Sequence, residues 1–302
     1  MSSKDARGPE EPPPESPAPG GSPPATPAPE FPPRLFRAQL AYDGSRFHGW
    51  QYQPAQATVQ GEIERAIAEV TARAIRVQGA GRTDAGVHAF GQVCSFEVGT
   101  RLEPCRLMAA LNAHLPPDIR IFVLEEAPPG FSARFSACWR RYRYFLLRRP
   151  DPFRRGRAYV PRTWPDLSRM REASPVLIGE HEFSAFTTQP EGPFGCRVKE
   201  ARWDAWPGGY LFTIRSNRFL YQMVRILVGT FLDIGRGRVS PEAMARILAS
   251  GDRRAAGPLA PGVGLYLVEV GYEPPWPERD LPGDSSLGAT GAPLVAQFDV
   301  PI

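Results

Sequence analysis

Segments with the pattern of β-strands alternate with segments with the pattern of α-helices between residues 35 and 273 of this chain. Stretches rich in β-branched and aromatic residues that end at turn residues predict strands, and apolar residues with helical spacing predict helices. The expected strands are residues 37–42, 75–79, 91–98, 119–124, 139–147, 197–206, 210–216 and 266–271. The expected helices are residues 58–72, 104–114, 167–178, 219–234 and 241–249. This order predicts an α+β fold in which an antiparallel or mixed sheet is flanked by helices.

The two ends of the chain differ in composition from its middle. Residues 1–34 hold twelve prolines and few apolar side chains, so we expect a disordered, proline-rich tail. Residues 274–302 have a similar composition and predict a flexible tail. Residues 35–140 and 141–273 each supply strands and helices, which favours an N-terminal lobe and a similar C-terminal lobe around one cleft.

Composition excludes several classes of protein. The four cysteines form no CxxC pair and the four histidines no HExxH motif, so neither a disulfide framework nor a metal site is expected. No apolar run approaches the roughly 18 residues that span a bilayer, and no signal peptide is visible. We therefore expect a soluble, cytoplasmic protein.

The middle of the chain is basic. The whole chain has a net charge of +4, but its two tails carry −2 and −3, so residues 35–273 carry +9. Nearly all the basic residues are arginines, whose planar guanidinium suits phosphates and stacking on bases. Genome composition alone can also enrich arginine. The charge is therefore a reason to consider nucleic acid as a partner, without demonstrating it.

One loop between two expected strands carries the sharpest chemical pattern. This loop, here called the signature loop, has the sequence Gly-Arg-Thr-Asp-Ala-Gly-Val-His over residues 81–88. Its glycines allow tight turns, and they would present Asp84 at the tip as a carboxylate that can serve as nucleophile or general base. A lone Asp in a turn more often bonds its own backbone. From the residues alone, that structural role is the stronger interpretation.

Six segments in one order resemble those of the tRNA pseudouridine synthase A family, and the signature loop is one of them. The others are residues 42–51, 131–137 with 141–144, 179–186, 219–225, and 260–261 with 264–267. Six ordered matches over roughly residues 35–273 are far more specific than a single short motif. One stretch departs from the usual family form, because Leu259 and Val263 stand where Thr and His are common.

This resemblance implies the pseudouridine synthase fold, with two similar lobes around a basic catalytic cleft, and conversion of uridine to pseudouridine in tRNA. In the family the reaction takes place in the anticodon stem-loop, at tRNA positions 38–40, without a cofactor or metal. It breaks the bond between ribose C1′ and uracil N1 and rejoins the rotated base through C5. The resemblance also implies a homodimer with tRNA as its partner.

The resemblance also assigns roles to four residues. Asp84 matches the catalytic aspartate, which acts on the ribose or on the base; the sequence leaves these alternatives open. Tyr142 matches an active-site tyrosine that contacts the flipped uracil, although Tyr144 shares its face of the strand. Arg225 matches the partner of the aspartate, and an arginine in so apolar a helix needs such a partner. Arg82 is expected to contact RNA or to help displace the base.

A run of arginines interleaved with aromatic residues follows on the same strand. Its arginines are Arg140, Arg141, Arg143, Arg148, Arg149, Arg154, Arg155 and Arg157, and its aromatic residues are Trp139, Tyr142, Tyr144 and Phe153. This pattern suits a surface for looped or single-stranded RNA, and it is also typical of a solvated strand and loop. The alternative function is a non-catalytic RNA-binding protein or RNA chaperone of the same fold. That alternative explains the charge but not the joint presence of Asp84, Tyr142 and Arg225.

Overall fold

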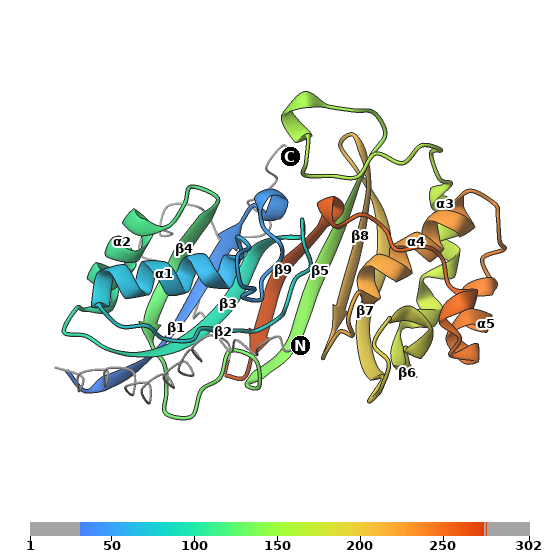
Figure 1. Cartoon of the computed structure of the whole chain (residues 1–302). Coiled ribbons are helices and arrows are strands. Elements are labelled where there is room, and N and C mark those ends of the chain that lie inside the picture. Colours follow the sequence, from blue (N-terminus) through green and yellow to red (C-terminus); the bar gives the residue numbers. More distant parts are fainter. Residues whose placement is uncertain (1–30, 275, 277–302) are drawn as a thin grey trace, which may run out of the picture.

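A computed structural model of the chain describes residues 31–274 and 276. In this part of the chain a single nine-stranded sheet has the order β4-β1-β3-β9-β5-β8-β7-β6, with the short β2 paired to β3 (Figure 1). The strands are β1 (Pro33–Tyr42), β2 (Gln78–Gly79), β3 (His88–Gly99), β4 (Ile119–Glu126), β5 (Ala137–Leu147), β6 (Gly179–Glu182), β7 (Gly195–Trp206), β8 (Gly209–Ser216) and β9 (Leu265–Tyr272). The helices are α1 (Val59–Thr71), α2 (Pro104–His114), α3 (Leu167–Ala173), α4 (Met223–Gly235) and α5 (Ala243–Ser250). The predicted α+β fold, with a largely antiparallel sheet flanked by helices, is confirmed.

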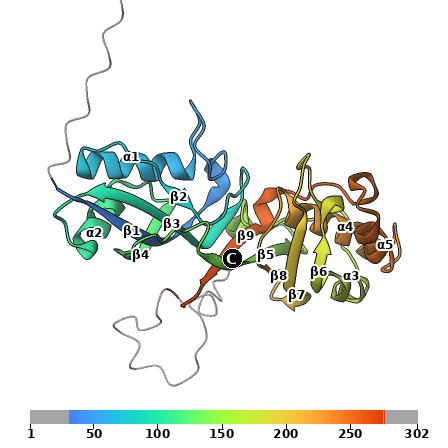
Figure 2. The ribbon, with the colours of Figure 1, turned by 90° about the horizontal axis from the view of Figure 1, so that it is seen from below.

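Each half of the sheet has its own helices. Helices α1 and α2 lie beside β1, β3 and β4, whereas α3, α4 and α5 lie beside β6, β7 and β8 (Figures 1 and 2). The last strand, β9, lies in the middle of the sheet and joins the two halves. It pairs with β5 along most of its length but with β3 only at His88↔Tyr266 and Ala89↔Leu267. The two halves therefore meet where the signature loop ends and β3 begins.

The sequence predicted two tails and, between them, two lobes that meet at residues 140 and 141. The predicted disordered tail and flexible tail lie outside the described residues, apart from residues 31–34, 274 and 276. The predicted lobe boundary between residues 140 and 141 falls inside β5, which pairs with both β8 and β9. Because one sheet runs through both halves, the division into two lobes stays a prediction.

Helix α1 shows how local sequence sets an element. The side chain of Thr58 accepts a hydrogen bond from the Gly61 N–H at 3.2 Å, as an N-cap does. Val59, Ile63 and Ala66 are buried on its inner face. Helix α2 begins at Pro104 and ends at His114, as predicted. None of the described helices is long and apolar enough to span a membrane.

Several predicted elements differ from the structure at their ends, among them β1, which begins at Pro33 and not at residue 37, and one strand was missed. Helix α3 ends at Ala173, and Pro175 opens a short 3-10 turn, because proline cannot continue the backbone hydrogen bonds. The expected strand 75–79 is reduced to β2, and β6 was not expected. Helix α4 begins at Met223 and not at residue 219. Gln222, just before it, has a left-handed backbone with φ of 61°, which helical residues do not adopt.

Candidate active site

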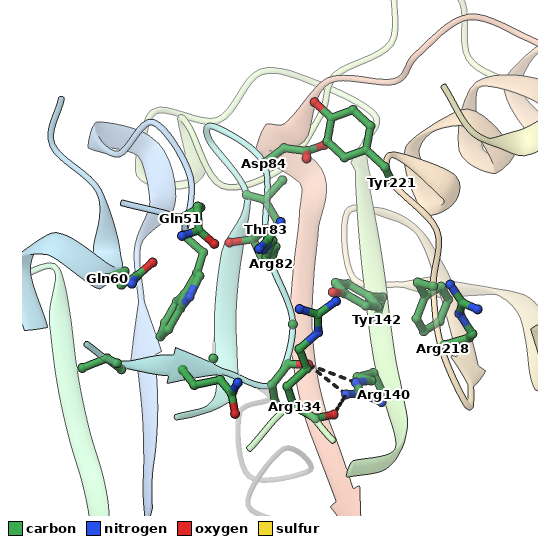
Figure 3. A pocket seen from close by; sticks show the side chains of 18 of the residues that line it. Gln51, Gln60, Arg82, Thr83, Asp84, Arg134, Arg140, Tyr142, Arg218 and Tyr221 are labelled. Carbon is green, nitrogen blue, oxygen red and sulfur yellow. Dashed lines mark hydrogen bonds between the residues drawn. The ribbon is translucent and has the colours of Figure 1, made fainter. Parts of the chain in front are cut away.

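A large cleft opens beside the signature loop, with a cavity volume of about 1310 Å³. Four parts of the chain supply most of its walls (Figure 3). They are residues 48–60, residues 76–85 around β2 and the signature loop, the segment 131–142 that leads into β5, and residues 218–225 before and within α4. The cleft thus lies between the two halves of the sheet, and its size suffices for a nucleotide extruded from RNA.

The signature loop is held in place before any substrate binds. The Trp50 N–H donates to the Thr83 carbonyl at 2.9 Å, and the hydroxyls of Tyr42 and Thr83 lie 2.8 Å apart. Within the loop, the Val87 N–H donates to the Asp84 carbonyl at 3.1 Å and closes a turn. These bonds fix the backbone on both sides of the Asp84 carboxylate, which therefore points from a rigid support into the cleft.

His88 ties the end of the loop to the centre of the sheet. Its side chain is buried, and Nδ1 accepts a hydrogen bond from the Gly44 N–H at 3.0 Å. Its ring stacks on Tyr266 of β9 with the ring centroids 4.5 Å apart. The last residue of the signature loop is thus anchored to the strand that joins the two halves.

Asp84 and Arg225 form an ion pair across the cleft. Arg225 Nη1 donates to Asp84 Oδ2 at 2.7 Å, and the two side chains are only 14% and 20% exposed, respectively. Arg225 Nε also donates to the Ala260 carbonyl at 2.8 Å, and its own carbonyl accepts from the Ala260 N–H. The guanidinium is therefore fixed by two bonds and in turn fixes one carboxylate oxygen. The predicted contact between these two residues is present.

Tyr142 lies deeper in the cleft and is 7% exposed. Its ring meets Phe219 edge-on, with the centroids 4.9 Å apart. Burial raises the pKa of the Tyr142 hydroxyl to about 12, so the phenol stays protonated at neutral pH. The structure therefore places Tyr142 in the cleft, as a neutral group that can donate a hydrogen bond.

Arg82 is exposed at the rim of the cleft. Two further arginines, Arg134 and Arg218, which the sequence analysis did not single out, also line this cleft (Figure 3). Within the described residues, none of these three side chains has an ion-pair partner. Unpaired guanidinium groups around a cleft favour an anionic ligand such as the phosphates of RNA.

The interleaved arginine run does not form one surface. The guanidinium of Arg140 is tied to backbone carbonyls, two of its bonds going to Ala80, and burial lowers its pKa. Arg141 lies on the opposite face of β5 and pairs with Glu200 and Glu269. Because side chains alternate between the faces of a strand, only part of the run is available to a ligand on any one side. The run therefore does not form one continuous surface, and RNA binding by its members stays a prediction.

Tyr221 is the residue that the sequence analysis missed most clearly. Its side chain is 56% exposed and lines the same cleft as Asp84, and Figure 3 shows its ring directed toward Asp84. The Thr187 hydroxyl donates to the Tyr221 carbonyl, and the Thr188 hydroxyl donates to the side chain of Gln222, both at 2.9 Å. These bonds hold the left-handed turn that orients Tyr221. No local sequence signal marks a turn held in this way.

The geometry agrees with comparisons to known proteins. A family model described as tRNA pseudouridine synthase matches residues 38–136 and 173–273. A tRNA pseudouridine synthase A from Chlorobaculum tepidum is 41% identical over 242 residues, which is 79% of this chain and 98% of that protein. The protein of that name from Bacillus subtilis is 42% identical over 243 residues, covering 78% of this chain and 98% of its own length.

The matched regions contain the signature loop, residues 218–225 and the segment around Ala260, so they supply both sides of the Asp84–Arg225 pair. Among the described residues, no group of three His, Cys, Asp or Glu side chains is placed to hold a metal ion. Asp84 and the arginine that fixes its carboxylate in the cleft thus both lie in a sequence that matches one family along most of its length. The chain belongs to the tRNA pseudouridine synthase family.

Proposed function

We propose that this protein isomerises uridine to pseudouridine in the anticodon stem-loop of tRNA, with Asp84 as the catalytic carboxylate. The observation that carries the proposal is the Asp84–Arg225 ion pair at 2.7 Å inside the large cleft. Arg225 neutralises the carboxylate without covering it, because it contacts only one of the two oxygens in the structure. The second oxygen is the one available to the substrate.

The reaction is an isomerisation and balances without a co-reactant. The C1′–N1 bond of uridine breaks, a C1′–C5 bond forms, and the hydrogen at C5 leaves while N1 gains a proton. A carboxylate can assist as a nucleophile at C1′, as a base at C2′, or by attack at C6 of the base. All three roles need Asp84 ionised and held within reach of a nucleotide that has left its stack.

Two tyrosines are suited to the flipped base in different ways. Tyr142 is buried and presents a protonated hydroxyl, which suits a hydrogen bond to a uracil oxygen. Tyr221 is half-exposed and lines the cleft that holds Asp84, which suits stacking on the ring of the base. Arg82, Arg134 and Arg218 stand around them, and we assign them to the phosphates that flank the target nucleotide.

The partner and location belong to the same proposal. We propose a homodimer that acts on tRNA in the cytoplasm. Sedimentation equilibrium of the full chain tests the dimer, and a mass equal to one chain at micromolar concentration would contradict it.

The reaction is tested by tritium release from tRNA labelled at uracil C5. We expect the wild-type chain to release tritium in step with pseudouridine formation, because the new C1′–C5 bond expels the C5 hydrogen. The measurement is the radioactivity that passes to water, compared with a reaction on tRNA whose label is at C6. No release from a range of tRNAs that still bind the protein would favour a non-catalytic RNA-binding protein.

Replacing Tyr221 with leucine separates stacking from packing. We expect Tyr221→Leu to lower kcat/KM for tRNA by about tenfold, since stacking of a base on an aromatic ring contributes about 1–3 kcal/mol. Tyr221→Phe keeps the ring and should retain most of the activity. Phe122→Leu, on a half-exposed aromatic residue of β4 outside the cleft, is the matched control. Equal activities of the leucine variant and the wild type would show that Tyr221 does not contact the base.

A further inference from the structure

A second cavity lies at the far end of β5 and shares no lining residue with the catalytic cleft. Its volume is about 560 Å³, within the range of about 300–1,000 Å³ that is usual for ligand pockets. Most of its lining residues belong to the loop that follows β5 and to the turn between β7 and β8. Nothing in the proposed reaction uses this cavity.

Aromatic side chains form one wall of this cavity, here called the β5-end pocket. The wall consists of Trp164, Trp206 and Tyr210. The rings of Trp164 and Tyr210 are 4.5 Å apart, and the Trp206 indole N–H donates to the Tyr210 carbonyl at 3.0 Å. Arg154 lies over the Trp206 ring at 5.1 Å and donates to the carbonyl of Pro207. The wall is therefore ordered by its own contacts and needs no ligand to form.

Cations that have no acidic partner form the rim of the β5-end pocket. Arg148 and Arg149 are exposed, and neither side chain has an ion-pair partner among the described residues. The one acidic side chain among the lining residues is Asp151, which accepts a bond from the Phe153 N–H and lies 3.5 Å from Arg154. The charge of Asp151 is thus directed to Arg154. The two rim arginines have no acidic partner among the described residues, and the Arg148 guanidinium lies over the Trp164 ring, 6.0 Å from its centroid.

We propose that the β5-end pocket binds an unpaired nucleotide of the tRNA substrate, at a point of the RNA other than the target uridine. The base stacks on the aromatic wall, and Arg148 and Arg149 bind the adjoining phosphates. An aromatic wall beside arginines that have no acidic partner is the combination with which proteins hold single-stranded nucleic acid. Arginine also suits phosphate better than lysine because its fork donates two parallel bonds. The inference rests on the proposed function for the identity of the RNA.

The β5-end pocket would give the enzyme a second binding site for the tRNA, in addition to the cleft that binds the target nucleotide. Two linked contacts raise the effective affinity without any change in the chemical step. The pocket should therefore influence KM and leave kcat unchanged. This split distinguishes it from the cleft, where substitutions are expected to lower kcat.

The test uses the full chain and the double variant Arg148→Ser/Arg149→Ser, with tRNA binding followed by fluorescence anisotropy over a range of salt concentrations. We expect Kd and KM to rise by about tenfold or more, kcat to stay unchanged, and the slope of log Kd against log salt to fall by about 1.5. Trp164→Leu should weaken binding by about fivefold without changing that slope, since it removes stacking and no charge. The matched control is Arg106→Ser/Arg246→Ser, which removes two exposed arginines of α2 and α5.

Unchanged Kd values for the arginine pair and for Trp164→Leu would overturn the inference, and so would an equal loss in the control. Tight binding of free AMP in the pocket, seen as quenching that Trp164→Leu removes, with unaltered tRNA binding, would also overturn it in favour of a free nucleotide. Failure of the proposed function is distinguishable, because it appears as absent tritium release by the wild type.

Discussion

Asp84→Asn is expected to lower kcat for pseudouridine formation by at least about 10³-fold while Kd for tRNA stays within about threefold of the wild type. The amide has nearly the shape of the carboxylate, so it preserves the packing of the signature loop. It carries no charge and is neither a nucleophile nor a base of useful strength. The measurements are single-turnover tritium release and anisotropy on the same tRNA preparation.

Asp204→Asn provides the control for the loss of one negative charge. Asp204 lies on β7 outside the cleft and pairs with Arg202 on the same strand. We expect this variant to retain full activity. Turnover by Asp84→Asn within tenfold of the wild type would contradict the catalytic role of Asp84, whatever the control shows.

Arg225→Met should cause the second-largest loss, lowering kcat by about 10²-fold and the free energy of unfolding by about 2 kcal/mol. Methionine fills much of the space of the arginine stem but donates neither to Asp84 nor to Ala260. The carboxylate loses the cation that fixes one of its oxygens, and the carbonyl of Ala260 loses its partner. The measurements are kcat from tritium release and the unfolding free energy from urea titration.

Arg225→Lys tests whether the residue acts by positioning Asp84. A lysine restores the positive charge but cannot hold the carboxylate and a carbonyl in one planar fork. We expect kcat to recover part of the way toward the wild-type value, with KM little changed in both variants. Arg246→Met, on the exposed face of α5, controls for the loss of a helical arginine. If Arg225→Met lowered the free energy of unfolding but kept the wild-type kcat, the role of Arg225 would be purely structural.

A predicted helix agrees with the structure where its ends depend on neighbouring residues, and it differs where they depend on residues far away along the chain. Helices α1 and α2 were predicted within about a residue because their ends depend on Thr58 and Pro104, which act on their own neighbours. The start of α4 was misplaced because the left-handed turn at Gln222 depends on hydrogen bonds from Thr187 and Thr188, far away in sequence. Contacts of that kind leave no periodic pattern.

The interleaved arginine run shows that the positions of site residues, like the ends of helices, depend on contacts that local sequence does not reveal. Its spacing suggested one surface, but the alternation of side chains across β5 sends Arg140 into the cleft and Arg141 to the opposite face. Tyr221 was missed because residues 219–222 were predicted as part of the helix, whereas α4 begins at Met223 and leaves Tyr221 in the turn before it. Both outcomes required the positions of strands and loops that are distant along the chain.

By itself the sequence determined the alternation of strands and helices, the rigid-looking signature loop with Asp84 at its tip, and the basic character of the middle of the chain. Those properties follow from local patterns and from composition. The resemblance to a known family, and no local pattern, implied that Arg225 pairs with Asp84. Only the tertiary structure decided that β9 lies at the centre of the sheet and how Arg225, 141 residues away along the chain, comes within 2.7 Å of Asp84. The physical reason is that strand order and helix packing arise from the burial of apolar surface by the whole chain, which no single segment encodes.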